Sequence, residues 1–151
     1  MKNHRILLVR DFMLAVLVTF LIASISHTQF VLMELARVGA EINLTTRISA
    51  SLQDLLGFLL SYAPVIAIGL LLGFSISNWV KTKFNSDSLG WYPIAGGLSL
   101  LTIHAAMYPI LEITLIAGAR SNAGLAVQIM AGVIGGWLFY QFRKRALSDN
   151  H

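Results

Sequence analysis

Apolar residues along the chain fall into four long runs that are separated by short polar segments. Each run is long enough to cross the hydrocarbon core of a bilayer as a helix, which takes about 20 residues. The predicted spans are approximately 12–35, 55–80, 91–117 and 123–142. The pattern therefore predicts an all-α integral membrane protein, a single membrane domain over 1–151, with four transmembrane helices in an up-down-up-down bundle.

The segment 37–54 is the only sizeable polar stretch between spans. Within it and just beyond, apolar residues recur at helical spacing, at Leu44, Ile48, Leu52 and Leu55. This pattern predicts a short amphipathic interfacial helix between the first and second spans, lying in the membrane interface. An ordinary loop helix packed over the bundle would show the same pattern. The stretch from Ser51 to Asp54 resembles a capping box that begins the second span.

Composition supports a membrane location. The chain is 56% hydrophobic and only 12% charged, whereas a soluble domain typically has about 25% charged residues. The net charge of +4 does not indicate nucleic acid, because the basic residues form no single patch and lie at the ends of the apolar runs. The bilayer is thus the expected partner, and no nucleic acid is expected.

Basic residues also predict the orientation of the chain. The side that holds both termini carries eight of them, Lys2, Arg5, Arg10, Lys81, Lys83, Arg143, Lys144 and Arg145. The other side carries three, Arg37, Arg47 and Arg120. Because cytoplasmic loops are enriched in Lys and Arg, we expect a multi-pass protein of the cell inner (plasma) membrane with cytoplasmic N- and C-termini. Trp79, Trp91 and Trp137 fall at the predicted cytoplasmic helix ends, as an aromatic belt would.

Small residues four positions apart mark two faces for close helix packing. These are Gly69 with Gly73 on the second span and Gly132 with Gly136 on the fourth. Glycines at this spacing let helix backbones approach closely. They either close this bundle or form a contact with other chains, so a homo-oligomer or the subunits of a larger membrane complex are the protein partners to expect.

The third span carries three polar side chains on one stripe. His104, Tyr108 and Glu112 are spaced at i, i+4 and i+8, which places them on one face of a helix. Counted from Ile94, His104 lies about 15 Å into the membrane, near the midplane, and Glu112 about 27 Å, near the outer boundary. Pro109 interrupts the same helix and frees a backbone carbonyl.

Two further polar residues fall in the same half of the membrane, His27 on the first span and Gln128 on the fourth. Ionisable groups in lipid usually face the bundle interior or a water-filled cavity. An outward-facing ligand or ion pathway is therefore predicted, with His104, Tyr108, Glu112, His27 and Gln128 as its residues. The structural alternatives are that Glu112 is a boundary residue that reaches water and that His27 and Gln128 form interhelical hydrogen bonds.

The residue types and motifs give little support for a metal site, a cofactor or an enzyme active site. The chain has no cysteine, which excludes disulfides and thiolate metal sites. Phosphate-loop, HExxH and GxSxG motifs are absent, so no catalytic residue and no metal ligand is predicted, and the interpretation leans away from an enzyme. His27 and His104 could ligate haem from two helices, but their estimated depths differ by about 7 Å. No cofactor is predicted, and haem stays a minor alternative.

Three functional hypotheses follow. The first is a small polytopic inner-membrane protein with an outward-facing polar pocket that handles a solute, ion or proton as part of an oligomer or complex. The second is a non-catalytic accessory or assembly subunit of a membrane complex, in which the polar residues only hold helices together. The third is a membrane-embedded enzyme or haem carrier that uses the same histidines.

Overall fold

A computed structural model describes residues 2–84, 90–111 and 122–148, with side chains for 5–84, 90–107 and 122–145. All regular secondary structure in these ranges is α-helical, as predicted. The helices are α1 (Lys2–Arg37), α2 (Leu44–Lys83), α3 (Trp91–Leu111) and α4 (Asn122–Ser148). The predicted residues 112–117 of the third span lie outside the described part of the chain.

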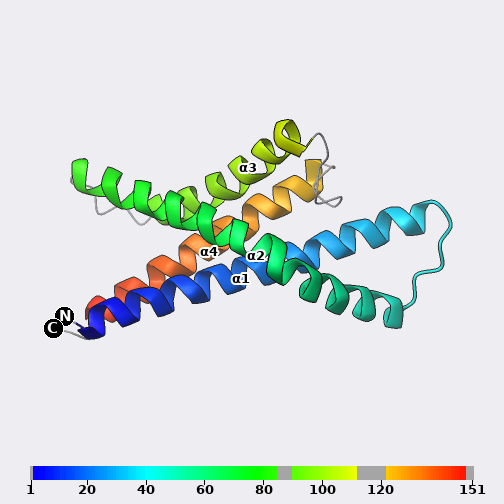
Figure 1. The fold of residues 1–151 in the computed structure, drawn as a ribbon, viewed down its shortest axis with the longest axis horizontal. Coiled ribbons are helices and arrows are strands. Elements are labelled where there is room, and N and C mark those ends of the chain that lie inside the picture. Colours follow the sequence, from blue (N-terminus) through cyan, green and yellow to red (C-terminus); the bar gives the residue numbers. More distant parts are fainter. Residues whose placement is uncertain (1, 85–89, 112–121, 149–151) are drawn as a thin grey trace.

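The four helices form a closed ring in which each packs against two others (Figure 1). Helix α4 lies between α1 and α3, and α2 crosses both α1 and α3 while hardly touching α4. The beginning of α1 and the end of α4 meet at one end of the bundle. Every helix therefore has one face turned toward a common interior.

Among the described residues, three helices are long and apolar enough to cross a membrane, Arg5–Arg37, Leu44–Lys83 and Asn122–Arg145. Large apolar side chains also point away from the bundle, and Leu60, for example, is 87% exposed. Outward apolar surface on this scale suits contact with lipid. Insertion into a membrane and the up-down order across it stay predictions.

The predicted interfacial helix is wrong, because residues 44–54 are the first part of α2 and not a separate element. The helix begins after Asn43, whose side-chain oxygen accepts a hydrogen bond from the backbone N–H of Thr46 at 2.8 Å. Ser51 does not cap a helix but donates to the carbonyl of Arg47 at 2.8 Å, as a serine inside a helix does. Because no glycine or proline interrupts 44–54, nothing in this stretch ends the helix before it enters the apolar run.

Helices α3 and α4 approach each other through glycines. A Cβ added to Gly96 would overlap the carbonyl of Gly132, and one added to Gly136 would overlap the carbonyl of Tyr92. Only glycine allows backbones this close. This contact fixes the distance between α3 and α4 over about one turn of each helix.

Gly69 and Gly73 of α2 lie against α3. A Cβ on Gly69 would meet the side chain of Ile103, and one on Gly73 would meet the hydroxyl of Ser99. Both small-residue faces that the sequence marks thus lie against helices of the same chain in this structure.

One aromatic ring from each helix fills the bundle near the end where α1 begins. Phe74 of α2 stacks on Phe139 of α4, with ring centroids 4.6 Å apart. Tyr92 of α3 meets Phe139 edge to face at 5.2 Å, and Phe12 of α1 meets Phe74 at 6.3 Å. We call Phe12, Phe74, Tyr92 and Phe139 the aromatic layer. Together with Leu70 and its buried apolar neighbours, it separates two groups of buried polar residues.

Candidate functional site

One polar side chain from each helix meets in the interior beyond the aromatic layer. They are His27 of α1, Tyr62 of α2, His104 of α3 and Gln128 of α4, and their exposed fractions are 7%, 3%, 6% and 1%. We call these four residues the polar cluster. Polar side chains are buried when they find partners or serve a function, so the contacts of each member matter.

Gln128 connects three helices by hydrogen bonds. Its amide nitrogen donates to the backbone carbonyl of Ala23 in α1 at 2.9 Å. Its amide oxygen accepts a hydrogen bond from the hydroxyl of Tyr62 in α2 at 3.3 Å. Both ends of the Gln128 amide are therefore engaged, which agrees with the interpretation that this residue holds helices together.

His104 has one engaged and one unengaged ring nitrogen. Its Nδ1 lies 2.8 Å from the carbonyl oxygen of Leu100, one turn earlier in α3. Its Nε2 is buried and meets no hydrogen-bond partner among the residues that the structure describes. A buried polar atom without a partner costs stability, so this nitrogen is the least expected feature of the cluster.

A row of rings leads from His104 to His27. The ring of Tyr62 lies edge-on to His104, with centroids 6.2 Å apart, and Phe58 lies 6.3 Å from Tyr62. The ring of His27 follows at 5.0 Å from Phe58. His27 is also close enough to His104 and to Asp54 for their charges to interact.

Polar contacts continue from His27 along the α1–α2 contact to the exposed part of the helices. Thr28 donates a hydrogen bond to the carboxylate of Asp54 at 2.7 Å. One turn further along α2, Gln29 donates to Ser51 at 3.1 Å and accepts from Arg47 at 2.7 Å. The polar cluster is thus joined to the surface by half-buried polar side chains of α1 and α2.

The structure brings together three of the five residues predicted for the pathway, His27, His104 and Gln128. The side chain of Tyr108 and the whole of Glu112 lie outside the described residues. Two members of this region, Tyr62 and Asp54, were not among the predicted site residues. The capping-box pattern places Asp54 at a helix start, whereas its position directly before the apolar run at Leu55 is the signal that it can reach the contact between α1 and α2.

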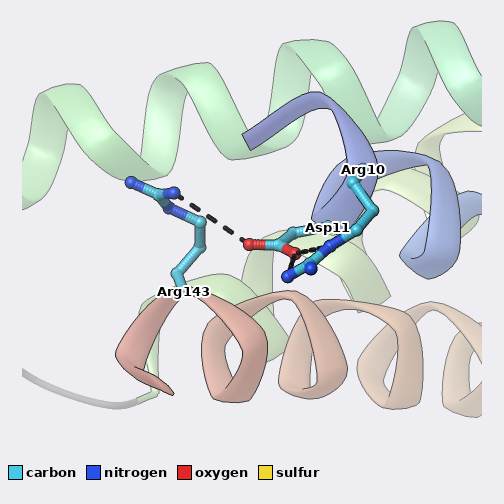
Figure 2. A network of polar contacts seen from close by, with 3 residues as sticks. All are labelled: Arg10, Asp11 and Arg143. Carbon is cyan, nitrogen blue, oxygen red and sulfur yellow. Dashed lines mark hydrogen bonds and ion pairs between the residues drawn. The ribbon is translucent and has the colours of Figure 1, made fainter. Parts of the chain in front are cut away.

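A second buried polar group lies on the opposite side of the aromatic layer, and Figure 2 shows its three residues. Asp11 of α1 is fully buried, and its Oδ1 accepts from Nε and Nη2 of Arg10 at 3.0 and 2.8 Å. Its Oδ2 lies 4.0 Å from Nη1 of Arg143 in α4. We call these three residues the Asp11 ion cluster.

Asp11 is not among the site residues predicted from the sequence, because it follows the basic residues Lys2, Arg5 and Arg10 near the N-terminus. The sequence does contain a signal, because Asp11, Ala15 and Thr19 recur every four residues. The structure buries all three. A carboxylate at the head of a small-residue stripe is expected to face the neighbouring helix.

Cavities lie elsewhere in the molecule. A groove of about 770 Å³ runs between α2 and α3, and a hollow of about 370 Å³ lies beside Asn43 at the start of α2. Neither is lined by a member of the polar cluster. The cluster is packed, and the open outward pocket stays a prediction.

The polar cluster offers few ligands for a metal. Within the described ranges, no three residues of the types His, Asp and Glu lie where they could hold an ion together. The lack of a cofactor remains an expectation.

No protein-family model, curated protein or solved structure matches the chain. Function is therefore inferred from the arrangement of the side chains alone.

Proposed function

We propose that the protein spans the inner membrane four times with cytoplasmic termini and transfers protons through its interior, with His104 as the central acceptor. The observation that carries this proposal is the buried Nε2 of His104, which meets no hydrogen-bond partner in the described part of the chain. Ionisable residues inside a membrane are costly and commonly belong to proton or ion pathways.

The hydrogen bond at the other ring nitrogen supports a role as acceptor. The carbonyl oxygen of Leu100 can only accept, so Nδ1 of His104 carries the hydrogen in the 2.8 Å contact. In the neutral ring Nε2 then holds the lone pair. A proton arriving at His104 would bind at Nε2 without breaking an existing hydrogen bond.

The neighbouring residues supply a route for such a proton. Asp54 is half-buried at the α1–α2 contact, and its charge interacts with His27. His27 and His104 lie close enough for their positive forms to repel each other, so a proton would occupy one ring at a time. Carboxylates and histidines in series are the residue types found in membrane proton relays. This sequence of groups supports entry from the side where α1 and α2 are joined, the predicted extracytoplasmic side.

The packing of the cluster favours a proton over a larger solute. Its four side chains are each less than a tenth exposed, and neither cavity described above reaches them. Neither of the two described cavities offers a solute space at these side chains, whereas a proton passes between hydrogen-bonded groups and ordered water. The proposal holds for a single chain or for a chain within an oligomer.

The test is proton flux into vesicles that contain the purified protein and a trapped pH-sensitive dye, with a potassium diffusion potential as the driving force. His104→Gln keeps the size and polarity of the side chain but removes the titratable ring. We expect the flux to fall roughly 100-fold, the scale on which a positioned acid–base group acts, or to the rate of empty vesicles.

Ser61→Ala is the matched control, because Ser61 neighbours Tyr62 but is exposed, and its hydroxyl donates to the carbonyl of Gly57 in its own helix. It should leave the flux unchanged. Equal flux for wild type and His104→Gln, or no flux above empty vesicles for the wild type, would refute the proposal.

A specific observation supports a second candidate, a non-catalytic accessory subunit. The hydrogen bonds of Gln128 tie together α1, α2 and α4, which is what a purely structural polar core requires. For such a subunit, no substitution at His104 would change an activity, and the protein would be purified with other membrane subunits.

A further inference from the structure

The groove between α2 and α3 is the largest cavity described and plays no part in the proposed proton route. On α2 it extends from Val65 to Val80, and on α3 from Trp91 to Met107. At about 1.5 Å per residue, these segments are about 22 and 24 Å long. The groove thus covers most of a hydrocarbon core of about 30 Å, starting at the helix ends predicted to be cytoplasmic.

The floor of the groove is apolar and built from small residues. Gly69 and Gly73 lie in it, and they bring α2 against α3. Ser99 and Ser77 also line it. The Ser99 hydroxyl donates to the carbonyl of Ala95 at 2.7 Å, whereas the buried Ser77 hydroxyl meets no hydrogen-bond partner among the described residues. The remaining lining is almost entirely apolar. An occupant of this groove would therefore be a long, flexible apolar chain.

Among the residues that the structure describes, positive charge lies beside the groove at the end where α2 finishes and α3 begins. The ammonium group of Lys81 lies 5.5 Å from the ring centroid of Tyr92, beside the lining residues Val80 and Trp91. The ammonium group of Lys83 lies 4.9 Å from the ring centroid of Trp79. Lysine binds phosphate as a point charge, so the basic end complements an anionic head group while the groove complements its tail.

We propose that the α2–α3 groove binds an anionic phospholipid of the inner leaflet, with one acyl chain in the groove and the phosphate at Lys81 and Lys83. This inference rests on the membrane insertion assumed in the proposed function, but not on proton transfer. The attraction between one lysine and an anionic lipid surface corresponds to about a five-fold preference for an anionic lipid over an uncharged one.

The test uses tryptophan fluorescence in vesicles. In a Trp79→Phe/Trp137→Phe variant, Trp91 is the one remaining tryptophan of the three in the chain, and it lines the groove. Two vesicle preparations are compared. One contains brominated phosphatidylglycerol and the other contains brominated phosphatidylcholine, in each case with bromine at carbons 6 and 7 of one acyl chain. Unbrominated phosphatidylcholine makes up the rest of both preparations. We expect quenching of Trp91 to report roughly five-fold or greater enrichment of phosphatidylglycerol over phosphatidylcholine.

Two pairs of substitutions separate a groove site from general attraction to basic residues. Lys81→Gln/Lys83→Gln should reduce the enrichment to about one. Lys144→Gln/Arg145→Gln removes the same charge from exposed positions on α4, near the same end of the bundle, and should leave the enrichment unchanged. Equal loss in both pairs would overturn the inference.

A third variant tests the groove itself. Thr102 lines it and is exposed, so Thr102→Phe should fill part of the groove and lower the enrichment without disturbing the helix content measured by circular dichroism. Unchanged enrichment would place the lipid outside the groove and refute the inference.

The remaining outcomes are also decisive. If brominated lipids of neither kind quench Trp91 in inserted protein, and Thr102→Cys forms disulfide-linked dimers, a second copy covers the groove and the lipid site is refuted. Because the native chain has no cysteine, any disulfide-linked dimer must form through the introduced cysteine at position 102. His104→Gln should keep the lipid enrichment. A wild-type protein with enrichment but no proton flux would refute the proposed function and leave the lipid site standing.

Discussion

The polar cluster and the Asp11 ion cluster each contain a buried atom without a hydrogen-bond partner among the described residues, but they differ in the charges that surround it. They lie about 24 Å apart along α1, from Asp11 to His27, with the aromatic layer between them. The Asp11 carboxylate is fully buried, and its Oδ1 accepts hydrogen bonds from Arg10. Its Oδ2 has no hydrogen-bond partner among the described residues but faces the charge of Arg143, with Nη1 at 4.0 Å. The polar cluster contains a histidine nitrogen without a partner among the described residues.

The difference shows how each group relates to stability. A buried carboxylate is tolerated when charged partners offset its desolvation, and removing its charge leaves those partners uncompensated. A buried nitrogen without a partner lowers stability instead. We therefore interpret the Asp11 ion cluster as a contact that stabilises the packing of α1 against α4. We interpret the polar cluster as a site that is retained although it lowers stability.

The largest stability effect is expected from Asp11→Asn. It keeps the shape of the side chain but removes the charge that faces Arg10 and Arg143, and we expect a loss of about 2–3 kcal/mol. The value is set below that of a fully buried pair because the Arg10 side chain is 54% exposed. Reversible unfolding in mixed micelles measures it, and Arg145→Gln, at an exposed position, should change stability by about 0.5 kcal/mol or less. A similar small change for Asp11→Asn would contradict the comparison.

A smaller effect, of opposite sign, is expected from His104→Leu. It replaces the unpartnered nitrogen with an apolar group of similar size, so we expect unchanged stability or a gain of about 1 kcal/mol. The same unfolding measurement applies. A clear loss of stability would mean that Nε2 of His104 has a structural partner, or that the hydrogen bond from Nδ1 to Leu100 matters more than the unpartnered nitrogen, and the polar cluster would then not be a site retained at a cost to stability.

The smallest effect is expected from Tyr62→Phe. It removes one long hydrogen bond, of 3.3 Å to Gln128, and interhelical hydrogen bonds in membrane proteins average about 0.6 kcal/mol. Proton flux should persist, because the hydroxyl of Tyr62 donates to an amide and not to a histidine. If flux disappears with little change in unfolding, Tyr62 belongs to the proton route and the polar cluster has two functional members.

Much of the fold could be predicted because long apolar runs strongly constrain helices. The inward position of His27, His104 and Gln128 followed from the cost of polar groups in lipid. The order of the helices around the ring could not be predicted, since all four have similar apolar faces. It is this order that places Tyr62 beside His104.

The sequence-based predictions for 44–54 and for Asp11 failed because the same charge or spacing pattern is compatible with two structures. The amphipathic pattern of 44–54 is compatible with a separate helix or with the start of a long one, and only the cap at Asn43 decides between them. Asp11 lies next to Arg10 in a basic stretch, so a count of basic residues gives no indication that its carboxylate is buried. Its burial depends on Arg143, which is more than a hundred residues away in the chain.

The unbroken course of α2 has a consequence for how the molecule would sit in a bilayer. Its 40 residues extend about 60 Å, and the part from Leu55 to Val80 alone extends about 38 Å. A hydrocarbon thickness of about 30 Å accommodates that part at an inclination of roughly 40° from the membrane normal. A thicker bilayer would let α2 stand more upright and so change its angle to α3. Membrane thickness would then set the width of the groove between these two helices.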